Sequence, residues 1–286
     1  MVYPPESDLA RERPDPRASG LPDADGSRDL LLDTPRGTLF ARVWGDWHAP
    51  LRPPPIVLIH DSLGSVELWR DFPARLAAAT GHPVAAYDRL GFGRSDAYPG
   101  GLGAGFISDE PSTGLAPLRA ALGIDRMILF GHSVGGAMAV HAGGHFADAT
   151  AAVITMSAQA FVEDRTLLGL RNAKTAFAEP GQLERLARYH GRKAAWVLGA
   201  WIETWLDPAF ASWTLDADLR SLRCPVLAIH GDHDEYGSRA HPERIAALVP
   251  AFTEVVVIEQ CGHVPHREQP ERVLEAVRSF LTRLAL

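Results

Sequence analysis

Short, continuous apolar runs recur along the chain and alternate with helical patterns, and this alternation limits the fold more than any other feature. Three such runs are PIVLIH (residues 55–60), RMILF (residues 126–130) and CPVLAIH (residues 224–230). Runs of this kind are typical of strands that are covered on both faces. Strands separated by helices indicate βαβ crossovers, which connect parallel strands. We therefore expect an α/β fold in which a mostly parallel sheet is flanked by helices.

The alternation stops between residues 159 and 222, where we find helical patterns and no convincing strand. QLERLARYH and AAWVLGAWIETWL belong to this stretch. A helical segment between two sheet strands is typical of a lid or cap over one edge of the sheet. We interpret residues 159–222 as a helical cap inserted between strands, and residues 29–158 and 223–286 as the core.

The predicted cap is rich in tryptophan and alanine. The four-residue spacing of Val197, Trp201 and Trp205 favours packing on one face of a helix. Binding pockets are mostly apolar with few polar anchors, so a lining of this kind would suit an apolar or aromatic group. We therefore also keep Trp196, Trp201 and Trp205 as candidates for the substrate pocket.

Residues 1–28 differ in composition from the rest of the chain. They carry prolines and charges but hardly any large apolar group, which predicts a disordered or loosely docked N-terminal arm. A secretory signal would need an apolar centre in this position, and no run of about 18 apolar residues occurs elsewhere. We therefore expect a cytoplasmic protein.

Charge and cysteine content limit the partners. The formal net charge of −7 leaves no basic surface for nucleic acid or an anionic membrane. Cys224 and Cys261 lie far apart and lack the spacing of a metal site or a disulfide framework. The glycine-rich loop around Gly91 lacks the spacing of a nucleotide-binding loop. We expect a small-molecule substrate, no nucleic-acid or membrane partner, and neither metal nor cofactor, and a homodimer stays open.

The segment RMILFGHSVGGAM carries the strongest chemical signal. A strand pattern runs directly into Gly131, Ser133 and Gly135 and then into a helical pattern, as a G-x-S-x-G nucleophile elbow requires. Such a turn is strained, and the two glycines let the strand and the helix approach each other. Ser133 is therefore the candidate nucleophile. The N–H of Val134 lies at a helix N-terminus, so it is a candidate donor to an oxyanion.

A serine hydroxyl needs a base within hydrogen-bond reach, and an acid to orient that base. His263 lies between a strand pattern and the last helix, and we favour it over its rival His266, three residues later. The acid candidates Asp232, Asp234 and Glu235 follow the preceding strand pattern. The resulting chain order of serine, acid and histidine is the order found in one large class of parallel-sheet hydrolases.

These segments carry a family resemblance. FGHSVGG, IHGDHD, CGHVPH, YDRLGFGRSD and IHDSLGS are similar to segments of the α/β-hydrolase superfamily, in its branch of small bacterial esterases, lactonases, C–C bond hydrolases and cofactor-free haloperoxidases. The resemblance covers nearly all of the chain except the arm and the cap. It implies that Asp234, three residues after Gly231, is the acid, and that the N–H of Ser62 is the second oxyanion donor.

A serine at the elbow implies acyl chemistry, whereas related dehalogenases and epoxide hydrolases carry an aspartate there. We therefore expect a serine hydrolase that cleaves a carboxylic ester of a small, apolar or aromatic substrate through an acyl-enzyme. A lactonase, a C–C bond hydrolase and a perhydrolase or haloperoxidase are alternatives with the same triad. A non-catalytic ligand-binding protein of this fold is the hypothesis of a different class.

One residue departs from the resemblance. Asp61 stands where relatives usually have glycine, next to the proposed oxyanion donor. Aspartate tolerates some of the backbone angles that glycine permits, but a carboxylate beside an oxyanion would oppose the developing charge. We therefore predict that the Asp61 side chain turns away from the pocket.

Overall fold

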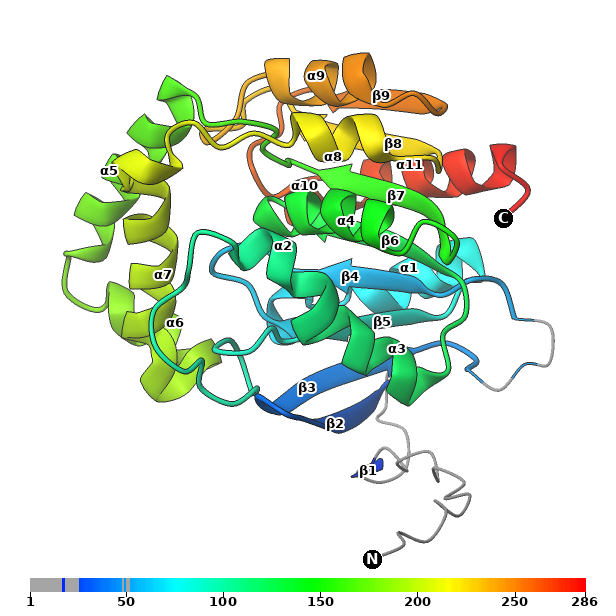
Figure 1. The fold of residues 1–286 in the computed structure, drawn as a ribbon, viewed down its shortest axis with the longest axis horizontal. Helices are drawn as coiled ribbons and strands as arrows, with labels where there is room; N and C mark the ends of the chain where they lie inside the picture. Colours follow the sequence, from blue (N-terminus) through cyan, green and yellow to red (C-terminus); the bar gives the residue numbers. More distant parts are fainter. Residues whose placement is uncertain (1–16, 19–25, 48, 50–51) are drawn as a thin grey trace, which may run out of the picture.

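The computed structural model describes residues 17–18, 26–47, 49 and 52–286 (Figure 1). β2 (Arg28–Thr34) and β3 (Gly37–Trp44) form an antiparallel hairpin. The short strand β1 (Arg17–Ala18) pairs with the outer side of β2. The predicted N-terminal arm otherwise lies almost entirely outside the described residues, and its disorder stays a prediction.

The central sheet is mostly parallel, in the order β1-β2-β3-β5-β4-β6-β7-β8-β9. All neighbouring pairs from β5 onward are parallel. The strands of this part are β4 (Ile56–Ile59), β5 (Val84–Tyr87), β6 (Met127–His132), β7 (Thr150–Met156), β8 (Val226–Gly231) and β9 (Thr253–Ile258). Every residue of β4 to β8 is buried, as the apolar runs predicted. The expected α/β fold with a flanked, mostly parallel sheet is confirmed.

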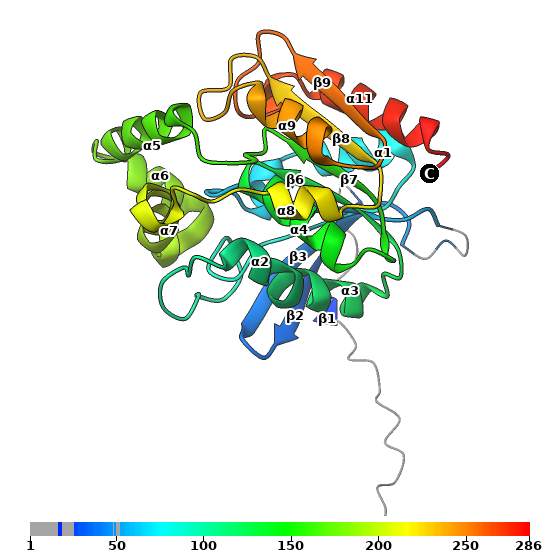
Figure 2. The same cartoon turned by 45° about the horizontal axis from the view of Figure 1, so that its top comes forward.

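Helices cover both faces of the sheet, and each face has its own hydrophobic core (Figures 1 and 2). α1 (Phe72–Thr80) and α11 (Pro270–Arg283) pack together on one face. On α11, Val273, Val277 and Phe280 form a buried stripe at helical spacing. The other face is covered by α2 (Phe106–Glu110), α3 (Ala116–Leu122), α4 (Val134–His145), α8 (Asp216–Ser221) and α9 (Ala240–Leu248).

Three helices between β7 and β8 project from the sheet, beyond the carboxyl ends of its strands (Figure 1). These insertion helices are α5 (Asp164–Phe177), α6 (Gln182–His190) and α7 (Ala194–Leu206). The carboxyl edge of a parallel sheet is where the ligand sites of such folds form. The insertion helices therefore stand over the edge at which a site is expected.

Hydrogen bonds fasten the insertion helices at both ends. At the start of α5, Arg165 donates to the carbonyl of Asp234 at 3.1 Å, and the Thr166 hydroxyl donates to the carbonyl of Tyr236 at 2.7 Å. At the opposite side of the insertion, where α6 ends, the N–H of Gly93 donates to the ring of His190 at 2.9 Å. The insertion helices therefore bridge two loops of the sheet edge.

Among the described residues, no helix is both long enough and apolar enough to cross a membrane.

Candidate active site

Ser133 occupies a sharp turn between β6 and α4. Its backbone has φ 55° and ψ −124°, a strained conformation for a residue other than glycine. A Cβ atom at Gly131 would lie 1.9 Å from the carbonyl oxygen of Gly135, and one at Gly135 would lie 2.2 Å from the carbonyl oxygen of Ile59. Both positions therefore require glycine, and the close packing that they permit holds the serine above the end of β6.

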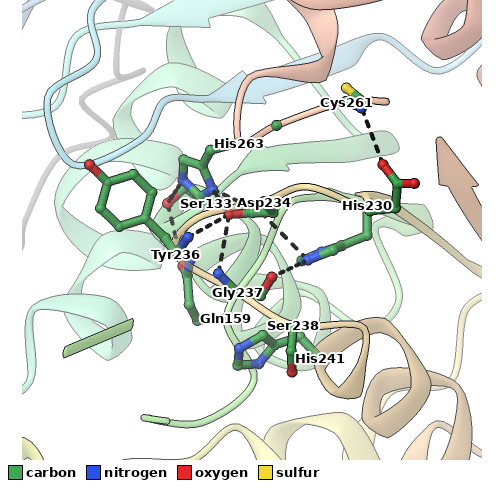
Figure 3. Close-up of polar contacts among 12 residues, drawn as sticks. Ser133, Gln159, His230, Asp234, Tyr236, Gly237, Ser238, His241, Cys261 and His263 are labelled. Carbon is green, nitrogen blue, oxygen red and sulfur yellow. Dashed lines mark hydrogen bonds and ion pairs between the residues drawn. The ribbon is translucent and has the colours of Figure 1, made fainter. Parts of the chain in front are cut away.

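The structure brings Ser133, His263 and Asp234 into one hydrogen-bonded chain (Figure 3). Ser133 Oγ lies 3.0 Å from His263 Nε2, and His263 Nδ1 lies 2.9 Å from each carboxylate oxygen of Asp234. All three residues are buried. The three side chains follow β6, β8 and β9, so the carboxyl edge of the sheet collects them from distant parts of the sequence.

The rival residues have other partners. Asp232 Oδ1 accepts the N–H of Cys261 at 3.3 Å and has no hydrogen bond to His263. The ring of His266 packs against Trp69, with 4.7 Å between ring centroids, and burial lowers its pKa well below the ordinary value. His266 is therefore a neutral packing residue in this arrangement, and the geometry selects His263 and Asp234 from the alternatives.

The electrostatics of the His263 and Asp234 pair suit proton transfer. Burial by itself would lower the pKa of His263, but the charge and hydrogen bonds of Asp234 outweigh it, so the pKa lies above the ordinary value. Burial would raise the pKa of Asp234, but the charge and hydrogen bond of His263 outweigh it and the pKa is lowered. Asp234 is thus held as a carboxylate, and it favours a proton on His263 Nδ1.

The two predicted oxyanion donors flank the nucleophile. Val134 is the first residue of α4, so its N–H has no acceptor within the helix and lies at the positive end of the helix dipole. Ser62 follows β4, whose last residue Ile59 pairs with Gly131 of β6. Ser62 and Ser133 line the same cavity. Both predicted donor residues therefore lie near Ser133, Val134 as its neighbour in sequence and Ser62 at the shared cavity.

A cavity of about 210 Å³ opens beside the nucleophile. Trp201 and Trp205 of α7 line it, together with Leu170 of α5. The structure does not place Trp196 in this cavity: its ring stacks on Tyr98, 5.5 Å between centroids, and its Nε1 donates to the carbonyl of Gly100 at 2.8 Å. Trp196 therefore fastens α7 to the loop after β5, in contrast to our expectation of a pocket residue.

Gln159 is a polar residue of the site that the sequence analysis missed. Its Oε1 lies 3.3 Å from Ser133 Oγ, and the side chain is buried in the lining of the cavity (Figure 3). Gln159 follows β7, at the sheet edge where catalytic groups collect. That position after a buried strand was a usable signal for a residue of the site.

Asp61 does not turn away from the cavity, so our prediction for it was wrong. It lines the cavity together with Ser133 and His263. A Cβ atom at Gly64 would lie 2.2 Å from Asp61 Oδ1, so the absent side chain of Gly64 leaves room for the carboxylate to fold over its own loop. In that position Oδ1 lies 3.8 Å from His132 Nδ1.

Histidines keep the Asp61 carboxylate ionised. Burial would raise its pKa, but a hydrogen bond and the charges of His132, His60 and His263 outweigh burial, and the pKa falls well below the ordinary value. His132 Nε2 in turn lies 2.8 Å from the carbonyl oxygen of His263 and donates to it. Asp61 is therefore part of a polar contact chain that ends on the backbone of the candidate base.

In the part of the chain that the structure describes, no group of three or more His, Cys, Asp or Glu side chains is arranged to hold a metal ion. Cys224 and Cys261 are buried and not bonded to each other, and burial raises the pKa of both thiols, to about 11 and about 12.

The profile of the alpha/beta hydrolase family matches residues 56–276. The 2-hydroxy-6-oxo-2,4-heptadienoate hydrolase of Pseudomonas putida is 25% identical over 259 residues, which are 79% of this chain and 88% of that enzyme. A 1-acylglycerol-3-phosphate O-acyltransferase of Homo sapiens is 39% identical, but over 85 residues. The match covers 24% of that protein, so the chain spans about a quarter of its length.

Solved structures of two hydrolases share the fold. The carboxylesterase CesB of Bacillus subtilis has a TM-score of 0.64 at 22% identity, covering 89% of this chain and 91% of that one. The enol-lactonase of Burkholderia xenovorans LB400 has a TM-score of 0.67 at 20% identity, covering 88% of this chain and 99% of that one. At these identities the likeness shows the fold alone.

Proposed function

Because the chain belongs to the alpha/beta hydrolase family, we propose that it is a serine hydrolase that cleaves carboxylic esters of small, apolar or aromatic substrates through an acyl-enzyme. The observation that carries this proposal is the hydrogen-bonded chain from Ser133 through His263 to Asp234. A protein that only binds a ligand has no need of all three groups in this geometry.

In the proposed first step, Ser133 Oγ attacks the ester carbonyl while His263 Nε2 takes the hydroxyl proton. Asp234 stabilises the resulting imidazolium. The carbonyl oxygen becomes an oxyanion that accepts the N–H groups of Ser62 and Val134, each worth about 3 kcal/mol of barrier. Collapse of the intermediate breaks the bond to the alcohol, which leaves with the proton from His263.

In the second step, water replaces the alcohol. His263 Nε2 takes a proton from the water, whose oxygen attacks the acyl carbonyl, and the same two N–H groups hold the second oxyanion. Collapse releases the acid and returns the proton to Ser133 Oγ. The amide of Gln159, 3.3 Å from Ser133 Oγ, is available to orient the substrate or the attacking water.

The cavity supports the proposed substrate class. Leu170, Trp201 and Trp205 give it an apolar side, and about 210 Å³ is room for a small substituent. A lactonase, a C–C bond hydrolase and a perhydrolase would use the same triad, and the Pseudomonas relative carries the name of a heptadienoate hydrolase. A small-molecule substrate and a cytoplasmic location remain parts of the proposal.

Labelling by a fluorophosphonate probe tests the proposal, because the probe reacts with an activated serine. We expect wild type to be labelled and Ser133→Ala not to be. Ser62→Ala is the matched control, since the proposal uses the backbone N–H of Ser62, so labelling should persist. If wild type is not labelled and hydrolyses no ester, lactone or vinylogous diketone, the proposal fails and the ligand-binding alternative takes its place.

A further inference from the structure

A second cavity, of about 240 Å³, lies next to the first. It is lined from one side by residues of α6, and from the other by α10 (Pro265–Glu268) and the residues before it. Asp61, Leu63 and Val264 line both cavities. Leu63 and Val264 therefore lie at the boundary of the two cavities, which are direct neighbours.

Two guanidinium groups distinguish the second cavity from the first. Arg185 of α6 and Arg267 of α10 line it, and both residues are exposed. Within the described residues, neither side chain has an ion pair or a hydrogen bond. Arg244, by contrast, forms an ion pair with Asp216 at 2.6 Å. The two arginines of the cavity are thus free to bind an anion without losing a partner.

The remaining lining suits a polar head on an apolar stem. Gln182 and Tyr189 of α6 add groups that can donate hydrogen bonds, while Leu68, Phe177 and Leu186 are apolar. The carboxylate of the lining belongs to Asp61, which faces His132 and lies where the two cavities meet. An anion in the second cavity is repelled by Asp61 and attracted by the two guanidinium groups, so it binds in the part of the cavity that the arginines line.

We propose that the second cavity is a subsite for an anionic group, a carboxylate or a phosphate, and that the substrate is an ester carrying such a group a short distance from the scissile carbonyl. This inference rests on the proposed ester hydrolysis at Ser133. Guanidinium groups match both anions, because their planar forks donate two hydrogen bonds to a pair of oxygens.

The test compares matched esters that differ only in charge. p-Nitrophenyl hexanoate and mono-p-nitrophenyl adipate differ by a carboxylate on the acyl side. 4-Ethylphenyl butyrate and 4-(carboxymethyl)phenyl butyrate differ by one on the alcohol side. The butyrate ester of 4-hydroxyphenyl phosphate brings a phosphate instead. We measure kcat and KM for wild type, Arg185→Ala and Arg267→Ala, with Arg188→Ala, on the same helix but outside the cavity lining, as the control.

For at least one anionic ester, we expect either cavity variant to raise KM about 5- to 10-fold, the size expected for one charge-assisted contact near the surface. The kcat for that ester, and KM for its neutral partner, should change less than about 2-fold. Arg185→Lys should recover part of the loss, because it keeps the charge. The preference for a carboxylate or a phosphate in wild type identifies the anion.

Equal effects on neutral and anionic esters, or no effect in either cavity variant, would overturn the subsite. Failure of the proposed function has a different signature, namely no turnover of any ester by wild type. In that case calorimetric titration of Ser133→Ala with mono-hexyl adipate and hexyl phosphate, with and without Arg185→Ala, still decides whether the cavity binds anions.

Discussion

Asp234→Asn removes one charge from the candidate triad and keeps the size of the side chain. In wild type, His263 Nδ1 lies 2.9 Å from both carboxylate oxygens. Oδ1 also accepts the N–H groups of Tyr236 and Gly237, at 2.8 and 3.1 Å. Those two donors hold an oxygen at the Oδ1 position, so the NH2 group of the asparagine takes the other position and faces His263.

An NH2 group donates hydrogen bonds and does not accept them, so it favours the tautomer of His263 that has no proton on Nδ1. Nε2 then carries the proton and cannot take another from Ser133 Oγ, 3.0 Å away. Loss of the correct tautomer costs about 10⁴-fold in kcat in enzymes with a Ser-His-Asp triad, which corresponds to roughly 5 kcal/mol of barrier.

The assay is hydrolysis of p-nitrophenyl butyrate, with kcat and KM measured for each protein and Tm as the check on folding. Asp232→Asn is the matched control, because Asp232 bonds the N–H of Cys261 and not His263. The control should keep kcat within about 3-fold of wild type, since it leaves the triad intact. A kcat for Asp234→Asn within about 10-fold of wild type, at unchanged Tm, would refute the tautomer argument.

Three further changes have defined outcomes. The charge of Asp61 raises the pKa of His263, and His263 can act as a base only when it is unprotonated. Asp61→Asn should therefore move the acid limb of the kcat/KM profile to lower pH. An acid limb at the wild-type pH would contradict this prediction. Burial raises the pKa of Glu110 from 4.5 to about 7. Ionisation of this carboxyl group therefore lowers the free energy of unfolding by about 3 kcal/mol. Stability should therefore fall as pH rises from about 4.5 to 7, and urea unfolding of Glu110→Gln should show a weaker fall over that range. Gly135→Ala puts a Cβ atom 2.2 Å from the Ile59 carbonyl oxygen and should lower the free energy of unfolding by about 3 kcal/mol or more. The measurement is the midpoint of urea unfolding, which should fall. A midpoint equal to that of wild type would mean that the turn at Ser133 relaxes around the added methyl group.

The fold and the strained turn that holds the candidate nucleophile could be predicted because both depend largely on local patterns. Apolar runs that are buried on both faces specify strands of a covered sheet, whatever lies far away in the sequence. Part of the elbow is equally local, since Gly131 is required by the carbonyl group of Gly135, four residues later. Gly135 is required by the carbonyl group of Ile59 on the neighbouring strand β4. His263 follows from topology, because the carboxyl ends of parallel strands meet at one edge.

Side-chain directions within the site could not be predicted, because they depend on residues that are distant in sequence. Asp61 faces the cavity because Gly64 leaves space and His132, from another strand, attracts the carboxylate. Trp196 leaves the cavity because Tyr98 and Gly100 bind its ring. The position of Gln159 after a strand places it at the sheet edge, but nothing in the sequence predicts its contact with Ser133 Oγ. None of these contacts has a signature in the sequence.

The fastening of the insertion helices at both ends bears on the route by which substrate reaches Ser133. A flap needs one free end to swing, and here Arg165 and Thr166 bind the carbonyl groups of Asp234 and Tyr236. Lifting α5 would pull on the loop that carries Asp234, so each opening would disturb the contact of Asp234 with His263. We therefore expect substrate and product to pass through the arginine-lined cavity while the insertion helices stay in place. Hinge motion of these helices should then not limit the turnover rate.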